Sequence, residues 1–265
     1  SILDPGTSII RVRPNETFLE VFNTRASLSY KPEKYNTTYQ RASTPNNTMF
    51  YGSIVPTKLS ATDFRQNRLT SSLEGIKTFR ENIQVNHEKV TYSRWEVVEP
   101  IRLATICHYK DFLSDGSMLS ELNKEYTEFM NQIDPKLAQN SVTVNDFISE
   151  QFAKNPINYD YEYMISAYYA ELAVIMFGLD GVVYPSVKAE GRGLNVALSK
   201  ESADNKIKLI AAGECRIMRN GFNPEIITES TIEIVDDTKP FIFTKLKTEK
   251  ELEEMWKLCL QNPQL

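Results

Sequence analysis

The sequence predicts a mixed α/β (α+β) fold in which helices flank a mixed sheet. Short runs of alternating or β-branched apolar residues, which are typical of strands, recur toward both ends of the chain, and segments with helical spacing lie between them. With 265 residues, 41% of them apolar, the chain can bury a large core. It contains no repeat and no low-complexity linker, so we expect a single domain over residues 1–265.

The N-terminal part predicts strands around one long polar loop. Residues 8–13 and 18–22 have the composition of short strands, and residues 48–55 are also strand-like. Between them, residues 29–47 are rich in Tyr, Thr, Asn and Pro, and residues 60–80 further on carry helical spacing. A loop as long as 29–47 in a compact domain is usually functional or mobile.

The middle of the chain predicts two strands and then three helices. Residues 89–98 alternate polar and apolar side chains, which predicts a strand, and a second strand is expected over residues 101–108 after a break at Pro100. We expect the two to form an antiparallel pair or one kinked strand. The helices are expected over residues 117–133, 144–154 and 159–177. The last is apolar on nearly all sides, which predicts central packing, and Gly178 marks its end.

The C-terminal part completes the sheet. Four further strands are expected over residues 181–184, 194–198, 206–217 and 230–236, and a charged amphipathic helix over residues 249–261.

Composition narrows the classes of partner. The formal charge of -5 and the pI near 5.3 leave no broad basic footprint, so nucleic acid is not an expected partner. No apolar run approaches the length of a membrane span, so no membrane partner is expected either. The three cysteines form no C-x-x-C pair and no disulfide framework, which indicates a reducing compartment and hence the cytoplasm.

Motifs of several common enzyme classes are absent from the sequence. It has no G-x-x-x-x-G-K-[ST], no G-x-G-x-x-G after a strand and no G-x-S-x-G, which argues against P-loop, Rossmann and α/β-hydrolase sites. Its two histidines, His87 and His108, lack metal-ligand spacing, so we expect neither a metal site nor a Ser-His-Asp triad.

Two groups of residues do carry a recognisable pattern. Residues 181–186 (GVVYPS) are an apolar run that ends in a turn, and Asn195 lies nine residues after Ser186 in a second apolar run. Near the N-terminus, residues 41–45 (RASTP) precede Phe50-Tyr51. With these groups in this order, the chain resembles the RES-domain family, relatives of ADP-ribosyltransferases that consume NAD. The resemblance is strongest over residues 9–213 and implies a bent mixed sheet, the ADP-ribosyltransferase-like RES fold.

The resemblance implies Arg41, Tyr51, Glu74 and Ser186 as catalytic residues. Breaking the nicotinamide–ribose bond builds positive charge on the sugar, which a carboxylate at Glu74 would stabilise. The forked guanidinium of Arg41 suits a pyrophosphate. Tyr51 would stack on the nicotinamide ring, and Ser186 would donate a hydrogen bond to a phosphate, a ribose hydroxyl or the glutamate.

Two more residues complete the implied substrate site. Arg11, on the strand where the resemblance begins, and Asn195, in the strand after Ser186, are assigned with Arg41, Tyr51 and Ser186 to substrate binding.

The function implied is that of a cytoplasmic toxin of a toxin–antitoxin system. It would cleave NAD at the nicotinamide–ribose bond as a glycohydrolase or phosphorylase, with NAD as substrate, no further cofactor, and a neutralising antitoxin protein as partner. Two alternatives stay open: a mono-ADP-ribosyltransferase that modifies a protein, and a non-catalytic nucleotide-binding module.

Overall fold

The computed structural model describes residues 1–55, 76, 83–107, 118–154, 157–186, 193–221 and 224–262. These residues form a mixed α+β protein with ten strands and six α-helices. The chain divides into two compact units, each of which is built from three separate segments. We call them unit 1 (residues 1–7, 30–54 and 97–207) and unit 2 (residues 8–29, 55–96 and 208–265).

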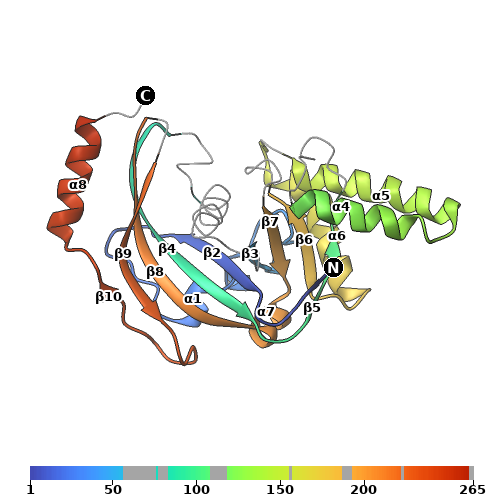
Figure 1. The fold of residues 1–265 in the computed structure, drawn as a ribbon, viewed down its shortest axis with the longest axis horizontal. Helices are drawn as coiled ribbons and strands as arrows, with labels where there is room; N and C mark the ends of the chain where they lie inside the picture. The colour runs from blue at the N-terminus through green and yellow to red at the C-terminus, as the bar shows by residue number, and fades with distance from the viewer. Residues whose placement is uncertain are drawn as a thin grey trace. The chain divides into compact units, whose positions relative to one another are not determined.

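The strands of unit 1 form a mixed sheet in the order β1-β5-β6-β7-β3 (Figure 1). Only β5 and β6 pair in parallel, and the other neighbours pair antiparallel. The strands are β1 (Ile2–Leu3), β5 (Ile101–Thr105), β6 (Gly181–Pro185), β7 (Leu194–Leu198) and β3 (Phe50–Val55). Gly181 is required where β6 meets β7, because a Cβ atom there would lie 2.0 Å from the carbonyl oxygen of Ala197.

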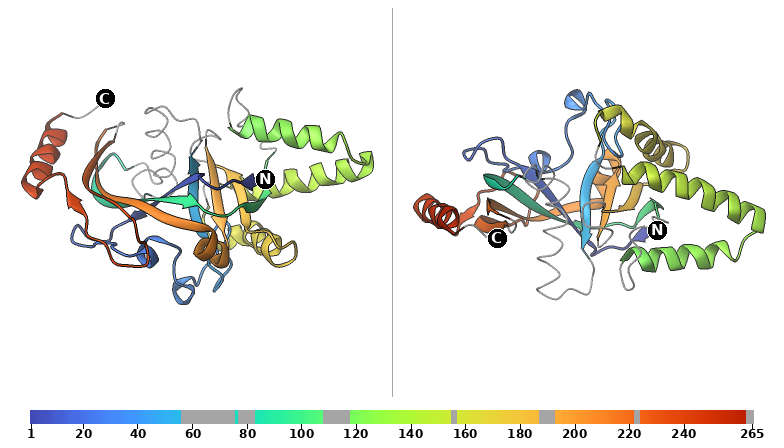
Figure 2. Two further views of the ribbon diagram at one scale, coloured as in Figure 1. Left: turned by 60° about the horizontal axis from the view of Figure 1, so that its bottom comes forward. Right: turned by 90° about the horizontal axis from the view of Figure 1, so that it is seen from above.

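Helices of unit 1 begin and end at recognisable signals. Asp134 caps α5 (Pro135–Ala153) by accepting hydrogen bonds from two backbone N–H groups, with proline in the first turn. The chain leaves α6 (Met164–Ile175) through Gly178, whose φ of 59° favours glycine. The others are η1 (Glu33–Tyr35), α4 (Met118–Met130), η3 (Asp160–Tyr163) and α7 (Lys200–Lys206). Helices α4 and α5 extend beyond the strands of unit 1 in the same direction (Figure 2).

The core of unit 1 lies between its sheet and helices α5 and α6. Val182, Tyr184 and Ala197 pack with Phe152 of α5 and Ala170 of α6. Helix α6 turns its small residues inward, since its buried positions are Ser166, Ala167, Ala170 and Ala173. Tyr169 and Val174 also pack against the core, but the other large side chains of this segment lie at the surface. The expectation that residues 159–177 pack centrally is therefore wrong for most of its large side chains.

Unit 2 has long, curved strands in the order β2-β4-β8-β9-β10 (Figure 1). They are β2 (Ser8–Pro14), β4 (Val85–Val97), β8 (Ile207–Asn220), β9 (Glu225–Glu233) and β10 (Thr244–Lys245). One side chain cluster of this sheet is apolar and includes Ile10, Val90, Tyr92 and Ile217. Helix α8 (Glu249–Gln261) packs Leu252 and Trp256 against Met218 and Ile227 of β8 and β9, and a short helix, α1 (Arg25–Leu28), precedes β3.

Several expectations from the sequence are confirmed by the structure. Residues 8–13, 194–198 and 249–261 form the elements predicted for them. Residues 89–98 and 101–108 contain strands, but β4 pairs with β2 whereas β5 pairs with β1 and β6, so they are not an antiparallel pair. The helix expected over residues 60–80 lies outside the described residues apart from Ile76.

Residues 18–22 do not form the predicted strand. The segment instead folds into a local turn, in which the backbone N–H of Glu16 donates to the carboxylate of Glu20 at 2.6 Å and the N–H of Glu20 donates to the hydroxyl of Thr17 at 3.2 Å.

Among the described helices, none combines the length and the apolar character that crossing a bilayer would require.

Candidate functional site

The Tyr51 hydroxyl holds the loop that carries Arg41. It accepts a hydrogen bond from the backbone N–H of Ala42 at 3.0 Å and lies 2.8 Å from the Oγ of Ser43. The same Oγ accepts the backbone N–H of Met49 at 3.0 Å, which closes the turn over residues 43–49. Because Tyr51 lies on β3, these bonds fix the start of the RASTP segment to the sheet of unit 1.

Arg41 is half-buried and is held by neutral groups. Its guanidinium donates to the carbonyl oxygens of Phe152 and Lys154 at the C-terminal end of α5. It also donates to the hydroxyl of Tyr163 at 3.2 Å, with its Cζ 5.0 Å from the centre of that ring. A cation suits the carbonyl end of a helix. Within the described part of the chain, however, no carboxylate neutralises Arg41.

Buried polar side chains line up across β3, β7 and β6. Ser53 pairs in register with Asn195, and Asn195 pairs with Tyr184. The Ser53 hydroxyl donates to the Oδ1 of Asn195 at 2.8 Å, and all three residues are buried. Since strand side chains alternate between faces, Tyr51 and Ser53 share one face of β3, the face that packs against α5 and α6. Ser186 follows β6 and is fully buried, with its N–H donating to the carbonyl of Gly193 at 2.8 Å.

Four of the six residues implied by the resemblance thus belong to unit 1. Arg41, Tyr51 and Asn195 lie on or beside neighbouring strands, and Ser186 follows at the end of β6. Arg11 lies on β2 of unit 2, opposite Ser93. Glu74 lies outside the described residues, so the structure gives no position for its carboxylate.

Two residues near the Arg41 loop were not singled out from the sequence. Glu171 of α6 accepts a hydrogen bond from the hydroxyl of Thr44 at 2.7 Å, so a carboxylate is attached to the same loop as Arg41. Tyr163 contacts the guanidinium directly. A signal for Glu171 was available, because it is the only charged residue in the twelve residues of α6. No comparable signal marks Tyr163 among the chain's thirteen tyrosines.

Thiol and metal chemistry find little support in the described residues. Burial raises the pKa of Cys107 to about 11, so its thiol, which accepts a hydrogen bond from Asn145 at 3.1 Å, stays protonated at neutral pH and is a poor nucleophile. Groups of three or more His, Cys, Asp or Glu side chains that could hold a metal ion are absent from the described ranges. His108 lies outside them.

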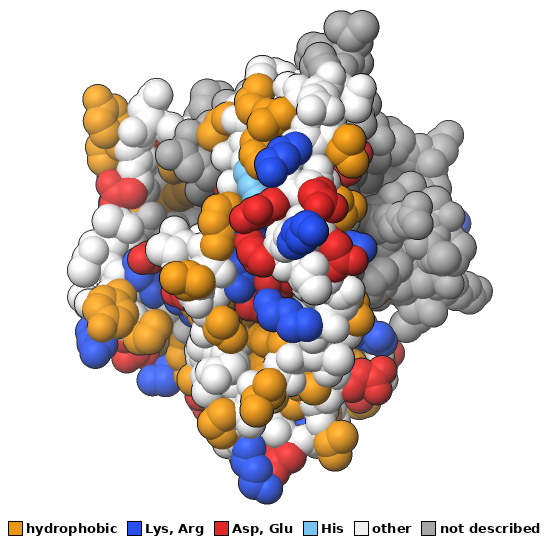
Figure 3. Space-filling view, turned by 90° about the vertical axis from the view of Figure 1, so that its left-hand side faces the viewer, with side chains coloured by type: hydrophobic (Ala, Val, Ile, Leu, Met, Phe, Trp, Pro, Cys, Tyr) orange, Lys and Arg blue, Asp and Glu red, His pale blue; other side chains and the backbone are white. Residues whose placement is uncertain are grey.

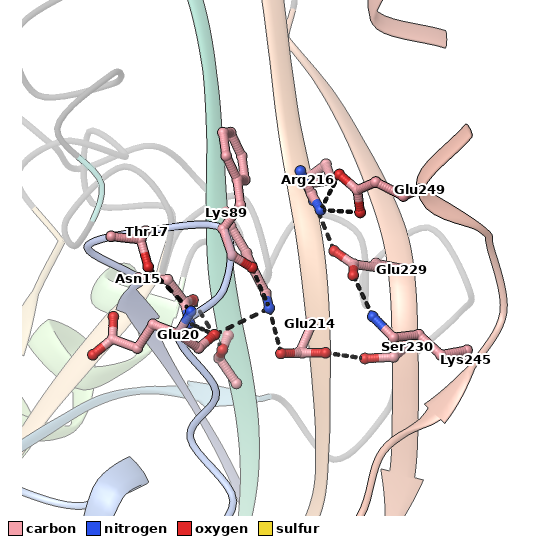
Figure 4. A network of polar contacts seen from close by, with 12 residues as sticks. Asn15, Thr17, Glu20, Lys89, Glu214, Arg216, Glu229, Ser230, Lys245 and Glu249 are labelled. Atoms are coloured by element: carbon pink, nitrogen blue, oxygen red, sulfur yellow. Dashed lines mark hydrogen bonds and ion pairs between the residues drawn. The ribbon is translucent and has the colours of Figure 1, made fainter. Parts of the chain in front are cut away.

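A second polar cluster, in unit 2, is a network of buried ion pairs (Figure 4). Lys89 of β4 pairs with Glu214 of β8 at 2.6 Å, and Glu214 accepts the Ser230 hydroxyl at 2.5 Å. Arg216 joins Glu229 of β9 at 2.7 Å and is also bridged by a carboxylate of α8 at 2.8 Å. The Lys89 ammonium also donates to two backbone carbonyls of the 15–20 turn. Because each charge has an opposite partner, the network is suited to fixing that turn and α8 on the sheet.

His87 lies at the edge of this network. Its ring packs between those of Phe18 and Trp256, with both centroid distances 4.9 Å. Burial, together with the nearby positive charge of Arg216, lowers the pKa of His87 below its usual value. At neutral pH the ring is therefore uncharged and acts as a packing group between two aromatic side chains.

Comparison of the chain with protein-family models and with curated proteins finds no match.

Proposed function

We propose that this chain cleaves NAD between nicotinamide and ribose. The observation that carries the proposal is the environment of Arg41. In the described structure this half-buried guanidinium has only neutral partners, two carbonyls and a tyrosine, which leaves its positive charge available to an anion. These contacts use three of the five N–H donors of an arginine. A pyrophosphate bound to the remaining donors would supply the missing negative charge.

The neighbouring side chains fit the rest of a dinucleotide. Tyr51 holds the Arg41 loop through its hydroxyl, and its ring lies against the core between sheet and helices. Asn195 and Ser186 offer polar groups at the same end of β6 and β7. In the proposal they bind ribose hydroxyls or phosphate oxygens, and the buried Ser53–Asn195 hydrogen bond fixes the amide in one orientation.

The proposed reaction breaks one bond and forms one. The C–N bond between ribose and nicotinamide breaks, its electron pair leaves with the neutral nicotinamide, and the sugar develops oxocarbenium character. Water or phosphate then attacks the sugar carbon and releases a proton. A carboxylate beside the ribose would stabilise the cation. The resemblance assigns this carboxylate to Glu74, whereas Glu171 is the carboxylate that the structure attaches to the Arg41 loop.

Mass spectrometry of NAD incubated with the pure chain tests the proposal. We expect nicotinamide in equal amount with ADP-ribose, or with its phosphate ester when phosphate is present. Arg41→Lys keeps the charge but loses the fork, and should lower kcat/KM by about tenfold to a hundredfold. Arg102→Lys is the matched control, because Arg102 lies in the same unit and donates its guanidinium N–H to the carbonyl of Gly178 at 2.8 Å.

The carboxylate is assigned by comparing Glu74→Gln with Glu171→Gln. The catalytic carboxylate should lose about 10²–10³-fold in single-turnover rate while NAD binding persists. Glutamine at 171 still accepts the Thr44 hydrogen bond, so folding is preserved there. Label appearing on protein would favour an ADP-ribosyltransferase, and tight NAD binding without turnover would favour a binding module. NAD neither bound nor consumed would overturn the proposal.

The same proposal makes the protein a cytoplasmic toxin that a partner protein neutralises. Expression of the chain alone should lower cellular NAD and stop growth, because NAD is shared by central metabolism. Arg41→Ala should relieve both effects at equal protein levels. Normal growth and normal NAD with the active, folded chain would contradict the toxin assignment without bearing on the chemistry measured with pure protein.

A further inference from the structure

One continuous stretch of unit 1 is acidic and aromatic and has no positive charge. Residues 155–187 contain Asp160, Glu162, Glu171 and Asp180 but neither lysine nor arginine. Hydrogen bonds from the backbone N–H groups of Tyr159 and Asn158 hold the pKa of Glu162 below its usual value, so this carboxylate is ionised at neutral pH. Asp180 pairs with Lys206, outside the stretch, at 2.8 Å. The stretch therefore carries the negative charge of Asp160, Glu162 and Glu171, which no basic residue within it compensates.

Eight large side chains of this stretch are exposed, and five of them recur at helical spacing. The fully buried positions of α6 are occupied by alanine and serine. Tyr169 and Val174 are partly buried against the core, which leaves the other bulky residues exposed. We call these residues the α6 stripe. They are Tyr161, Met164, Ile165, Tyr168, Leu172, Ile175, Met176 and Phe177, all of which are exposed. Positions 161, 165, 168, 172 and 175 recur every three or four residues, so they follow one face of the η3–α6 segment.

An exposed apolar row of this length marks an interaction surface. A monomer gains nothing by keeping eight large apolar side chains in water, whereas a partner's helix could bury the five that follow one face in a single row. By contrast, acidic, basic and apolar side chains lie interspersed on the face of unit 2 that carries α8 (Figure 3). The α6 stripe differs in having charge of one sign only along its own stretch of chain.

Charge decides which partner fits. Nucleic acid and anionic bilayers would be repelled by the acidic stretch. A second copy packed about a two-fold axis would place the same acidic groups against each other. A cationic partner would be attracted, and tyrosine faces bind guanidinium groups well. The segment already does so internally, since Arg41 stacks on Tyr163 with 5.0 Å between its Cζ and the ring centre.

We propose that the α6 stripe is a docking surface for an amphipathic basic helix of another protein. The apolar side of that helix would lie along Tyr168, Leu172 and Ile175, and its arginine or lysine side chains would reach the carboxylates of Asp160 and Glu162. This inference does not rest on NAD cleavage, because it uses surface side chains and charge alone.

A synthetic amphipathic peptide of leucine and arginine, about 18 residues long and labelled with a fluorophore, is the probe. Its binding to the full chain is measured by fluorescence anisotropy. A scrambled peptide of equal composition keeps the charge but loses the apolar side. The test variant is Leu172→Ser/Ile175→Ser, and the control is Leu258→Ser/Leu260→Ser on α8. The pairs are matched in exposure, at 46% and 69% against 59% and 45%.

We expect the wild-type chain to bind the amphipathic peptide at least about tenfold more tightly than the scrambled peptide. The α6 variant should bind the amphipathic peptide about tenfold more weakly than the wild-type chain does. The α8 variant should bind like wild type, and added salt should weaken binding. Far-UV circular dichroism checks that both variants remain folded. Equal binding of the two peptides, or of the two variants, would overturn the proposal by showing unspecific attraction. If light scattering shows a wild-type dimer that the α6 variant abolishes, the stripe binds a second copy of the chain instead. If the chain binds phosphatidylserine vesicles more strongly than it binds the peptide, the stripe binds a membrane instead.

Discussion

Replacing Lys89 by methionine tests the buried network of unit 2. Lys89 and Glu214 are each 2% exposed at the side chain, and their charged atoms lie 2.6 Å apart. Methionine keeps most of the lysine stem but removes the charge and the donors to two carbonyls. Glu214 would then hold a buried negative charge with the Ser230 hydroxyl as its remaining described hydrogen-bond donor.

The expected cost follows from that uncompensated charge. Removing one partner of a buried ion pair lowers the free energy of unfolding by about 3–5 kcal/mol. Removing both charges is far less costly, so Lys89→Met/Glu214→Gln, which keeps an acceptor for Ser230, should return to within about 1–2 kcal/mol of wild type. Lys245→Met is the exposed control. Lys245 pairs with Glu229 at 2.6 Å but its side chain is 63% exposed, so the loss should stay near or below about 1 kcal/mol.

Tryptophan fluorescence during urea unfolding measures this effect in the correct unit. Both tryptophans, Trp95 and Trp256, belong to unit 2, as Lys89 does. With an m-value of about 2 kcal/mol/M, a loss of about 3–5 kcal/mol lowers the midpoint by about 1.5–2.5 M. A loss below about 1 kcal/mol for Lys89→Met, or a double variant no more stable than the single one, would refute the assignment of a buried, mutually dependent ion pair.

Three further predictions concern unit 1. Gly181→Ala should lower the free energy of unfolding by more than about 3 kcal/mol in thermal unfolding, because the added Cβ would lie 2.0 Å from the carbonyl oxygen of Ala197. An unchanged Tm would contradict the close approach of the two strands. Tyr51→Phe should lower the free energy of unfolding by about 1–3 kcal/mol, because the Ala42 N–H and the Ser43 hydroxyl lose their partner. Denaturant unfolding followed by circular dichroism measures this loss, and wild-type stability would show that the hydroxyl is dispensable. Burial raises the pKa of Asp180, but hydrogen bonds from a lysine, a serine and a backbone N–H outweigh it and set the pKa below its usual value. The stability from Asp180 is therefore present above about pH 4 and lost as pH falls further, so Asp180→Asn should be less stable at neutral pH and should flatten the acid unfolding curve.

Local signals in the sequence were sufficient for elements that depend on near neighbours. Helix α8 begins at Thr248, whose side chain and that of Glu251 form a capping box, and its charged face distinguishes it clearly. Strand β7 coincides with the predicted residues 194–198 because it is a short apolar run bounded by polar residues. Arg41 and Tyr51 were singled out in another way, through the resemblance to the RES-domain family, which rests on their order along the chain.

Pairings between distant segments could not be derived in this way. Strands β4 and β5 are close in sequence, yet their partners come from elsewhere, because pairing depends on contacts that no local pattern encodes. Helix α6 is apolar all round, so periodicity cannot tell that its alanines rather than its larger residues face the sheet. The contacts of Arg41 with Phe152 bridge more than one hundred residues, which no spacing rule anticipates.

The way in which the units are divided along the chain has a consequence for synthesis. Unit 1 ends at Ile207, so the ribosome delivers all of its segments before the last segment of unit 2, Lys208–Leu265, exists. At about 5–20 residues per second, the 13 residues of this segment that complete β8, Lys208–Asn220, take about 0.7–2.6 s to emerge. During that interval β4 lacks its neighbour β8, and Lys89 lacks Glu214. The nascent chain therefore holds an open strand edge and an unpaired lysine, and it is in these seconds that a folding chaperone would have most to protect.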